Sequence, residues 1–290
     1  MAAVADAPSG RDAATAVPER RALVYDLVGL GLTLYARLAF RLRTVGDELR
    51  LERSTLLVAN HPRESDPAVL AGALFSTVHP RPFRPHPLVH FMLRADLHER
   101  GFFAGMPRAL PLWARRLLFP LGIGPILDGL LPCARIRTAT TMLVADLVRA
   151  APDAPLEELL PPDDVARLRE RAERLGRPRP RLGRDADAGD YADLLWWVVR
   201  ADDAPSPLAQ ELFGRRAGEA RADLQHFVDL VRGGGTLLVS PEGRASPDGS
   251  LQPLRRGATL LVRRAKPERV RPLAVAYDPL TSGRTWAYVG

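Results

Sequence analysis

Two short apolar runs, each ending abruptly in a polar turn, constrain the fold of this chain more than any other feature. The first is "STLLVAN" (residues 54–60), which "HPRESD" follows, and the second is "TLLVS" (residues 236–240), which "PEG" follows. A short continuous apolar run bounded by polar residues is typical of a fully buried strand. Ligands gather at the carboxyl ends of the strands in open α/β sheets. We therefore expect the two polar turns to share one pocket.

Helical patterns lie between these strands. "DPAVLAGALFSTV" (residues 66–78) begins with Asp66 and a proline, which suit the first turn of a helix. "ADLQHFVDLVR" (residues 222–232) has helical spacing and ends at three glycines. Strands that alternate with helices indicate an α/β fold. We predict a mixed sheet flanked by helices.

Composition divides the 290-residue chain into segments. Residues 1–21 are rich in alanine, proline and charge and lack the apolar core of a signal peptide, so we expect a disordered leader. We expect residues 22–43 to form an N-terminal helix and residues 44–290 to form one domain. Within that domain residues 151–218 are rich in proline, aspartate, glutamate and arginine. We interpret them as an insertion or lid on the core.

The N-terminal helix, "ALVYDLVGLGLTLYARLAF", approaches the length of a membrane span. Asp26 and Arg37 interrupt it, and a charged side chain is costly inside a bilayer. We therefore expect an amphipathic helix that lies on a membrane or packs on the domain, in preference to one that spans the bilayer.

The charge of the chain bears on its partners. The formal net charge of +7 comes almost entirely from arginine, because Lys266 is the only lysine. A basic surface favours anionic partners such as lipid headgroups or phosphorylated molecules. The arginines form no basic block and no aromatic platform accompanies them, so nucleic acid is not an expected partner. Cys133 is the only cysteine, which excludes an intrachain disulfide and a cysteine-rich metal site.

The first polar turn offers a histidine and a carboxylate. His61 is a natural general base, because the imidazole of histidine titrates near neutral pH. Asp66, five positions later, suits the second ring nitrogen, where it would hold the tautomer and stabilise the imidazolium. Two alternatives stay open: the pair caps a helix, or it belongs to a metallohydrolase. The chain lacks a second cluster of histidine and aspartate at strand ends, which weighs against the metal site.

The second polar turn contains Pro241, Glu242, Gly243 and Arg244. It offers a carboxylate, a flexible glycine and a guanidinium, and arginine binds phosphate through two parallel hydrogen bonds. Taken alone, the same residues also suit an ordinary surface turn.

Taken together and in this order, the segments resemble the glycerolipid acyltransferases of the lysophosphatidate acyltransferase type. The family's N-H-x-x-x-x-D block appears as "NHPRESD", and its F-P-E-G-T-R-S block appears as "SPEGRAS". An apolar strand ending near an arginine is matched by "LLPCARIR", where Arg135 or Arg137 takes the place of that arginine, and a strand that begins with proline is matched by "RPLAVAY". The four blocks occupy residues 60–66, 130–137, 240–246 and 271–277.

The resemblance implies a glycerol-3-phosphate acyltransferase-like fold and an enzyme of phospholipid biosynthesis. Such an enzyme moves a fatty acyl group from a thioester, acyl-CoA or acyl carrier protein, to a hydroxyl of an acceptor such as lysophosphatidate. It needs no metal and no cofactor besides the donor. The implied location is the cytoplasmic face of the cell membrane, either peripheral or held by a single N-terminal helix anchor. A non-catalytic lipid-binding relative is the alternative. The implied roles are His61 as base, Asp66 as its orienting acid, and Asn60, Arg135, Glu242, Gly243 and Arg244 in substrate binding.

The chain departs from the family pattern at two positions that bear on the acceptor. Arg244 stands where the family has threonine, and alanine stands where the family has its arginine. The phosphate-binding guanidinium is therefore shifted by one residue, or Arg255, Arg256 or Arg135 supplies it. Arg63 replaces a serine that commonly follows the histidine by two positions. These changes bear on the identity of the acceptor more than on the chemistry.

Overall fold

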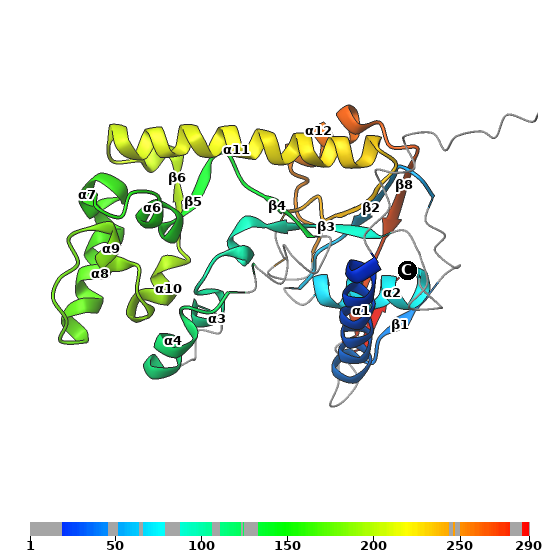
Figure 1. The fold of residues 1–290 in the computed structure, drawn as a ribbon, viewed down its shortest axis with the longest axis horizontal. Coiled ribbons are helices and arrows are strands. Elements are labelled where there is room, and N and C mark those ends of the chain that lie inside the picture. The colour runs from blue at the N-terminus through cyan, green and yellow to red at the C-terminus, as the bar shows by residue number, and fades with distance from the viewer. Residues whose placement is uncertain are drawn as a thin grey trace, which may run out of the picture. The chain divides into compact units, whose positions relative to one another are not determined.

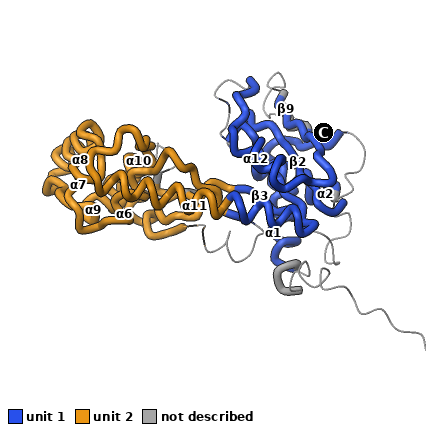
Figure 2. Tube along the Cα trace, turned by 90° about the horizontal axis from the view of Figure 1, so that it is seen from above, with its two compact units in different colours: residues 1–92, 130–134, 224–290 blue, residues 93–129, 135–223 orange. Residues whose placement is uncertain are grey.

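The computed structural model of the chain divides into two compact units (Figure 1, Figure 2). The first unit comprises Met1–Met92, Leu130–Ala134 and Leu224–Gly290, and the second comprises Leu93–Gly129 and Arg135–Asp223. Residues 151–218, which the sequence suggests as an insertion or lid, fall wholly inside the second unit. That unit begins much earlier in the chain, at Leu93.

The structure describes most of the chain. Most of the expected leader, residues 1–21, and the predicted site residue Arg244 lie outside the described residues. The described residues are 19–45, 52–63, 66–78, 88–105, 111–122, 124, 133–243, 246, 250–278 and 286–289.

The central sheet has five strands in the order β4-β3-β7-β2-β8 (Figure 1). The pairs β2–β7, β2–β8 and β3–β7 are all parallel. β2 and β7 are buried along almost their whole length, because helices cover a parallel sheet on both faces. The chain is thus an α/β protein with a mostly parallel central sheet. The strands are β2 (Thr55–Ala59), β3 (Val89–Arg94), β4 (Cys133–Ile136), β7 (Thr236–Val239) and β8 (Arg269–Leu273).

A separate three-stranded sheet has the order β1-β10-β9, and it contains the antiparallel pair β9–β10. The run "RPLAVAY" therefore does not form one strand, because it is divided between β8 and β9. The side-chain amide of Asn60 forms two hydrogen bonds with the backbone of Val275 at the start of β9: it donates to the carbonyl and accepts from the N–H. This contact lies at the point where the chain passes from the central sheet to the second one. The strands of the second sheet are β1 (Arg43–Thr44), β9 (Val275–Asp278) and β10 (Trp286–Val289).

Two helices of the first unit pack closely against each other. α1 (Glu19–Phe40) lies along α2 (Asp66–Val78). A β-carbon on Gly29 would come within 2.2 Å of a buried ring on α2, and one on Gly72 would come within 2.8 Å of a backbone oxygen of α1. Thr33 of α1 donates its hydroxyl to the carbonyl of Gly72 at 3.0 Å. The contact therefore depends on small residues that let the two backbones approach.

The second unit is mainly helical and has a hydrophobic core of its own. Leu147, Leu156, Leu168 and Leu195 in this core are at most 1% exposed. A short antiparallel pair, β5 (Thr141–Leu143) and β6 (Val198–Arg200), completes the unit. Its helices are α3 (Phe102–Gly105), α4 (Leu112–Leu118), α6 (Val144–Ala150), α7 (Leu156–Leu159), α8 (Pro162–Arg174), α9 (Gly183–Ala186) and α10 (Ala192–Leu195), with 3₁₀ turns at Ala95–His98, Gly189–Tyr191 and Ala201–Asp203. Two further helices are α11 (Pro207–Arg232), whose residues divide between the units, and α12 (Arg256–Ala265) in the first unit.

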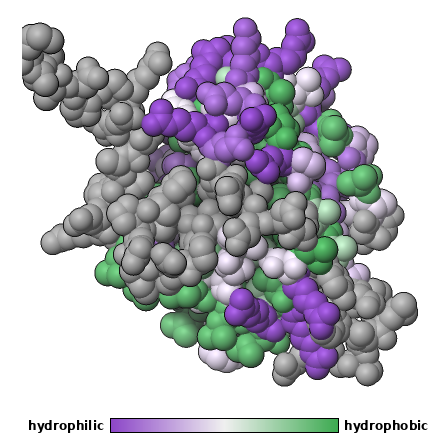
Figure 3. Space-filling model, turned by 90° about the vertical axis from the view of Figure 1, so that its right-hand side faces the viewer, coloured by the Kyte–Doolittle hydropathy of each residue, from purple (hydrophilic) through white to green (hydrophobic). Residues whose placement is uncertain are grey.

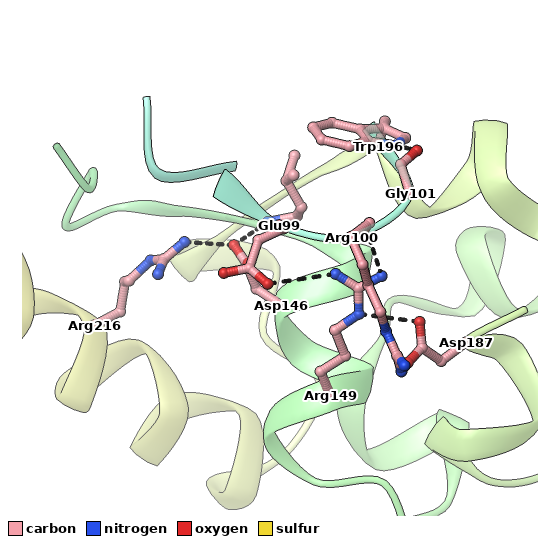
Figure 4. Close-up of polar contacts among 9 residues, drawn as sticks. Glu99, Arg100, Gly101, Asp146, Arg149, Asp187, Trp196 and Arg216 are labelled. Carbon is pink, nitrogen blue, oxygen red and sulfur yellow. Dashed lines mark hydrogen bonds and ion pairs between the residues drawn. The ribbon is translucent and has the colours of Figure 1, made fainter. Parts of the chain in front are cut away.

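Arginine–carboxylate contacts join distant segments of the second unit (Figure 4). Arg149 of α6 binds Asp187 at 3.0 Å and lies 3.6 Å from Glu99. Arg100 binds the same Asp187, and the carbonyl of Arg100 accepts a second hydrogen bond from Arg149. Trp196 donates its indole N–H to the carbonyl of Gly101. The guanidinium groups of this network are therefore engaged in holding the unit together.

Candidate active site

The two polar turns meet at one edge of the central sheet, as their positions after buried strands predict. β2 and β7 are parallel neighbours with Val58 opposite Val239, so both strands end at the same edge. The backbone N–H of His61, just beyond β2, donates to Glu242 Oε1, just beyond β7, at 3.3 Å. The two residues are 181 positions apart in the chain.

The main chain of His61 is held on both sides. Its N–H donates to Glu242, and its carbonyl accepts a hydrogen bond from the N–H of Ser246 at 2.8 Å. Its ring nitrogen Nδ1 lies 3.0 Å from Asp66 Oδ2. The side chain of Asp66 is 1% exposed, whereas that of His61 is 16% exposed. The carboxylate is therefore secluded, and the imidazole reaches the surface.

Asp66 accepts hydrogen bonds from three directions. Its Oδ2 faces His61 Nδ1 and accepts the backbone N–H of Arg63 at 2.6 Å. Its Oδ1 accepts the hydroxyl of Tyr277. A carboxylate has only acceptor atoms, so the hydrogen bond to it places the ring proton of His61 on Nδ1. The other ring nitrogen, Nε2, then presents a lone pair, which is the arrangement that a general base requires.

Tyr277 is a part of this site that the sequence did not reveal. It lies on β9, 211 positions after Asp66, and its hydroxyl binds the carboxylate. The guanidinium of Arg63 lies over the Tyr277 ring, 4.3 Å from its centre. The sequence shows an aromatic residue at the end of the fourth block, "RPLAVAY", but it does not show that this residue contacts Asp66.

The buried side chain of Glu242 binds two backbone segments of the site. Its side chain is 2% exposed, and its two oxygens accept the backbone N–H groups of His61 and Gln252, the latter at 3.1 Å. Gly243 follows with a φ of +68°, which glycine adopts at little cost, and its N–H closes a turn onto the carbonyl of Ser240 at 3.0 Å. Both residues therefore fix the turn that holds His61. Their contact with a substrate stays a prediction.

The sequence predicts that three further residues belong to the site: Asn60, Arg135 and Arg244. The amide of Asn60 is engaged with the backbone of Val275, at 2.9 Å and 2.6 Å, so this residue positions the end of β2. Arg135 lies on β4 and belongs to the second unit. Arg244 lies outside the described residues. Binding of substrate by these three residues stays a prediction.

We expect Glu242→Gln to destabilise the protein by about 1–3 kcal/mol, the cost of leaving a buried polar group without its partner. Glutamine turns one acceptor oxygen into an NH₂ group, which would face a backbone N–H donor in a site that is 2% exposed. Urea unfolding measures the change. Glu268→Gln, at an exposed position beside β8, is the matched control. An unfolding midpoint equal to that of the wild type would contradict the bracing role.

The second unit has a surface hollow of about 580 Å³, and none of its lining residues comes from the His61 site. Its arginines are engaged with carboxylates, since Arg100 and Arg149 share Asp187. The candidate site is therefore the edge of the central sheet where His61, Asp66 and Glu242 meet, and the hollow is not part of it. The hollow is lined by Glu99, Arg100, Val148, Arg149, Pro152, Arg184 and Asp187.

Within the ranges that the structure describes, no group of three or more His, Cys, Asp or Glu side chains is placed to hold a metal ion. Metal analysis of the purified protein is the measurement that decides the metallohydrolase alternative.

Comparison of the chain with protein-family models finds no match, and comparison with curated proteins finds none either. The resemblance to the glycerolipid acyltransferases therefore rests on the four sequence blocks.

Proposed function

We propose that this protein transfers a fatty acyl group from a thioester to a hydroxyl of a glycerolipid-like acceptor in phospholipid biosynthesis. The observation that carries the proposal is the His61–Asp66 pair, 3.0 Å apart, with a secluded carboxylate and a surface-reaching imidazole. The turn that contains Glu242 fixes the backbone of His61. This arrangement suits a base that acts on a hydroxyl arriving from outside.

In this mechanism His61 Nε2 removes the proton of the acceptor hydroxyl as the oxygen attacks the thioester carbonyl. Asp66 holds the ring in the required tautomer and stabilises the imidazolium. The tetrahedral intermediate then collapses: the carbon–sulfur bond breaks, and the thiolate leaves and takes the proton back from His61. The products are the ester and the free thiol. Base catalysis and the positioning of the two substrates together lower the barrier.

A transfer assay with one radiolabelled acyl-CoA tests this proposal. The acceptors are lysophosphatidate, other lyso-lipids and an uncharged monoacylglycerol, and acyl carrier protein replaces CoA in a second series. We expect a labelled ester with at least one acceptor. Hydrolysis of the thioester without ester formation would make the protein a hydrolase. Binding of lipid without turnover would favour the non-catalytic lipid-binding alternative.

We further propose that α1 holds the protein at the cytoplasmic face of the cell membrane. By length and composition alone, α1 is long and apolar enough to cross a membrane. Its exposed leucines form a stripe with helical spacing, on a different face of the helix from the one that packs on α2. Figure 3 shows hydrophobic residues at the lower left of one face of the molecule, with a hydrophilic cluster beside them at the lower right and a strongly hydrophilic upper part. The exposed leucines of α1 are Leu23, Leu27, Leu30, Leu34 and Leu38.

The other face of α1 favours a helix that lies on the membrane over one that spans it. Asp26 is fully buried, and Thr33 is hydrogen-bonded to Gly72 of α2. A spanning α1 would lose this packing and would place Asp26 in the hydrocarbon, which is costly. A helix that keeps α2 on one side and lipid on the other satisfies both faces.

Replacing Leu27 and Leu34 together with glutamate is expected to weaken binding to phospholipid vesicles by about 100-fold or more, since each buried leucine contributes about 1.5 kcal/mol or more. Both side chains are more than half exposed, so the unfolding midpoint should change little. Co-sedimentation with vesicles measures the effect. The control adds the same charge at exposed positions of α11, Gln210→Glu with Ala222→Glu. Equal binding by the leucine variant and the wild type would show that α1 does not face lipid.

A further inference from the structure

Arg63 is the exposed cation nearest in sequence to His61, at a position where the resembling family commonly has serine. Its guanidinium lies over the ring of Tyr277, 4.3 Å from the ring centre. The hydroxyl of that same tyrosine binds Asp66. One aromatic ring thus contacts both the carboxylate that orients the base and a cation at the surface.

The position of Arg63 is fixed by its backbone as well as by the ring. Its N–H donates to Asp66 Oδ2 at 2.6 Å, and its carbonyl accepts the N–H of Asp66 at 3.1 Å. The residue cannot move without disturbing the partner of His61. A charge fixed in this way loses less entropy on binding an anion than a mobile one does.

The two carboxylates of the site that the structure describes are already engaged. Asp66 serves three donors, and the two oxygens of Glu242 accept two backbone N–H groups. In the part of the chain that the structure describes, no carboxylate forms an ion pair with Arg63. A guanidinium carries five N–H donors in one plane, and contact with a ring does not occupy all of them. The edge of Arg63 therefore keeps donors for a planar, doubly hydrogen-bonded contact with an anion.

We propose that Arg63, held over Tyr277, binds a phosphate group of a substrate and so places the reacting group at His61. The inference rests on the proposed acyl transfer, which it deepens. The phosphate is that of the acceptor headgroup or one of those on the nucleotide of CoA. Both are anionic, and both can accept two parallel hydrogen bonds from a guanidinium.

Steady-state kinetics of Arg63→Gln separate the two sources. The acceptor is lysophosphatidate or monoacylglycerol, and the donor is acyl-CoA or the acyl-pantetheine that lacks the nucleotide. If Arg63 binds the headgroup, the KM for lysophosphatidate rises about 10- to 100-fold, the effect of losing hydrogen bonds to a charged group, and the KM for monoacylglycerol does not change. If it binds the nucleotide, the KM for acyl-CoA rises and that for acyl-pantetheine does not. Arg63→Lys should recover part of the loss, because a single ammonium keeps the charge but not the fork.

Arg53→Gln, which removes the same charge at the opposite end of β2, is the control and should leave all four constants unchanged. Calorimetric titration of the wild type and Arg63→Gln with glycerol 3-phosphate and with adenosine 3′,5′-bisphosphate tests binding apart from turnover. A protein without transferase activity that still binds one of these probes through Arg63 would overturn the proposed function and keep the phosphate site. Equal KM values and equal probe affinities in the wild type and Arg63→Gln would overturn the phosphate site alone.

Discussion

Replacing His61 with alanine is expected to lower the rate of acyl transfer by about 10²- to 10⁴-fold, the usual contribution of a positioned general base. Alanine removes the atom that takes the hydroxyl proton and leaves the backbone contacts to Glu242 and Ser246 in place. The fold should therefore survive. The loss should appear in kcat and in kcat/KM alike, since the proton transfer occurs in the transition state. Initial rates with a labelled acyl-CoA measure it.

His226→Ala is the matched control for this variant. His226 lies on α11 with its side chain exposed, and it takes no part in the candidate site. We expect wild-type rates and a wild-type unfolding midpoint. Full activity of His61→Ala, with a purified donor, would show that another group takes the proton and that the proposed mechanism is wrong.

The meeting of the two polar turns could be predicted from the sequence, because it depends on local patterns. The apolar runs that become β2 and β7 have the length and burial of core strands, and strands of that kind pair in parallel. The start of α2 at Asp66 follows from the Asp-Pro pair, since both residues suit a first turn. These inferences needed only neighbours along the chain.

The partners of individual side chains could not be predicted in the same way. Tyr277 reaches Asp66 across 211 positions, and its strand β9 belongs to a second sheet, where Val275 is hydrogen-bonded to the amide of Asn60. Glu242 is a polar residue in a polar turn, which favours a surface role, yet it is 2% exposed. Residue type shows which hydrogen bonds a side chain can form, and only the fold shows which of them it forms.

The extent of the second unit also exceeded what composition indicates. Residues 151–218 stand out because they are rich in charge and proline, whereas residues 93–129 and 135–150 have ordinary apolar runs. Their assignment to the second unit depends on packing into the core that contains Leu147 and Leu156. A pattern of apolar residues shows that a segment is buried, but it does not show in which core.

Asp66→Asn is expected to lower the transfer rate by about 10²- to 10⁴-fold with a much smaller effect on stability, because the amide can keep most of the hydrogen bonds but cannot keep the charge. If the amide oxygen faces His61 and Arg63, both N–H bonds survive and the NH₂ group meets the hydroxyl of Tyr277, which can turn to accept it. The imidazolium then forms without a neighbouring negative charge. If the NH₂ group faces His61 instead, the ring proton moves to Nε2 and the base is lost.

Either orientation of the amide thus removes catalysis by a route that leaves the fold largely intact. Tyr277→Phe separates the parts of this network, since it removes one donor to Asp66 and keeps both the carboxylate and the ring beneath Arg63. We expect a loss well below that of Asp66→Asn. Asp229→Asn, on the exposed side of α11, is the control for the amide and should match the wild type. The order of rates, Tyr277→Phe above Asp66→Asn and Asp66→Asn at or above His61→Ala, follows from a base that one charge orients. Asp66→Asn at the wild-type rate would instead make the carboxylate a helix cap, which is the ordinary role of an aspartate at that position.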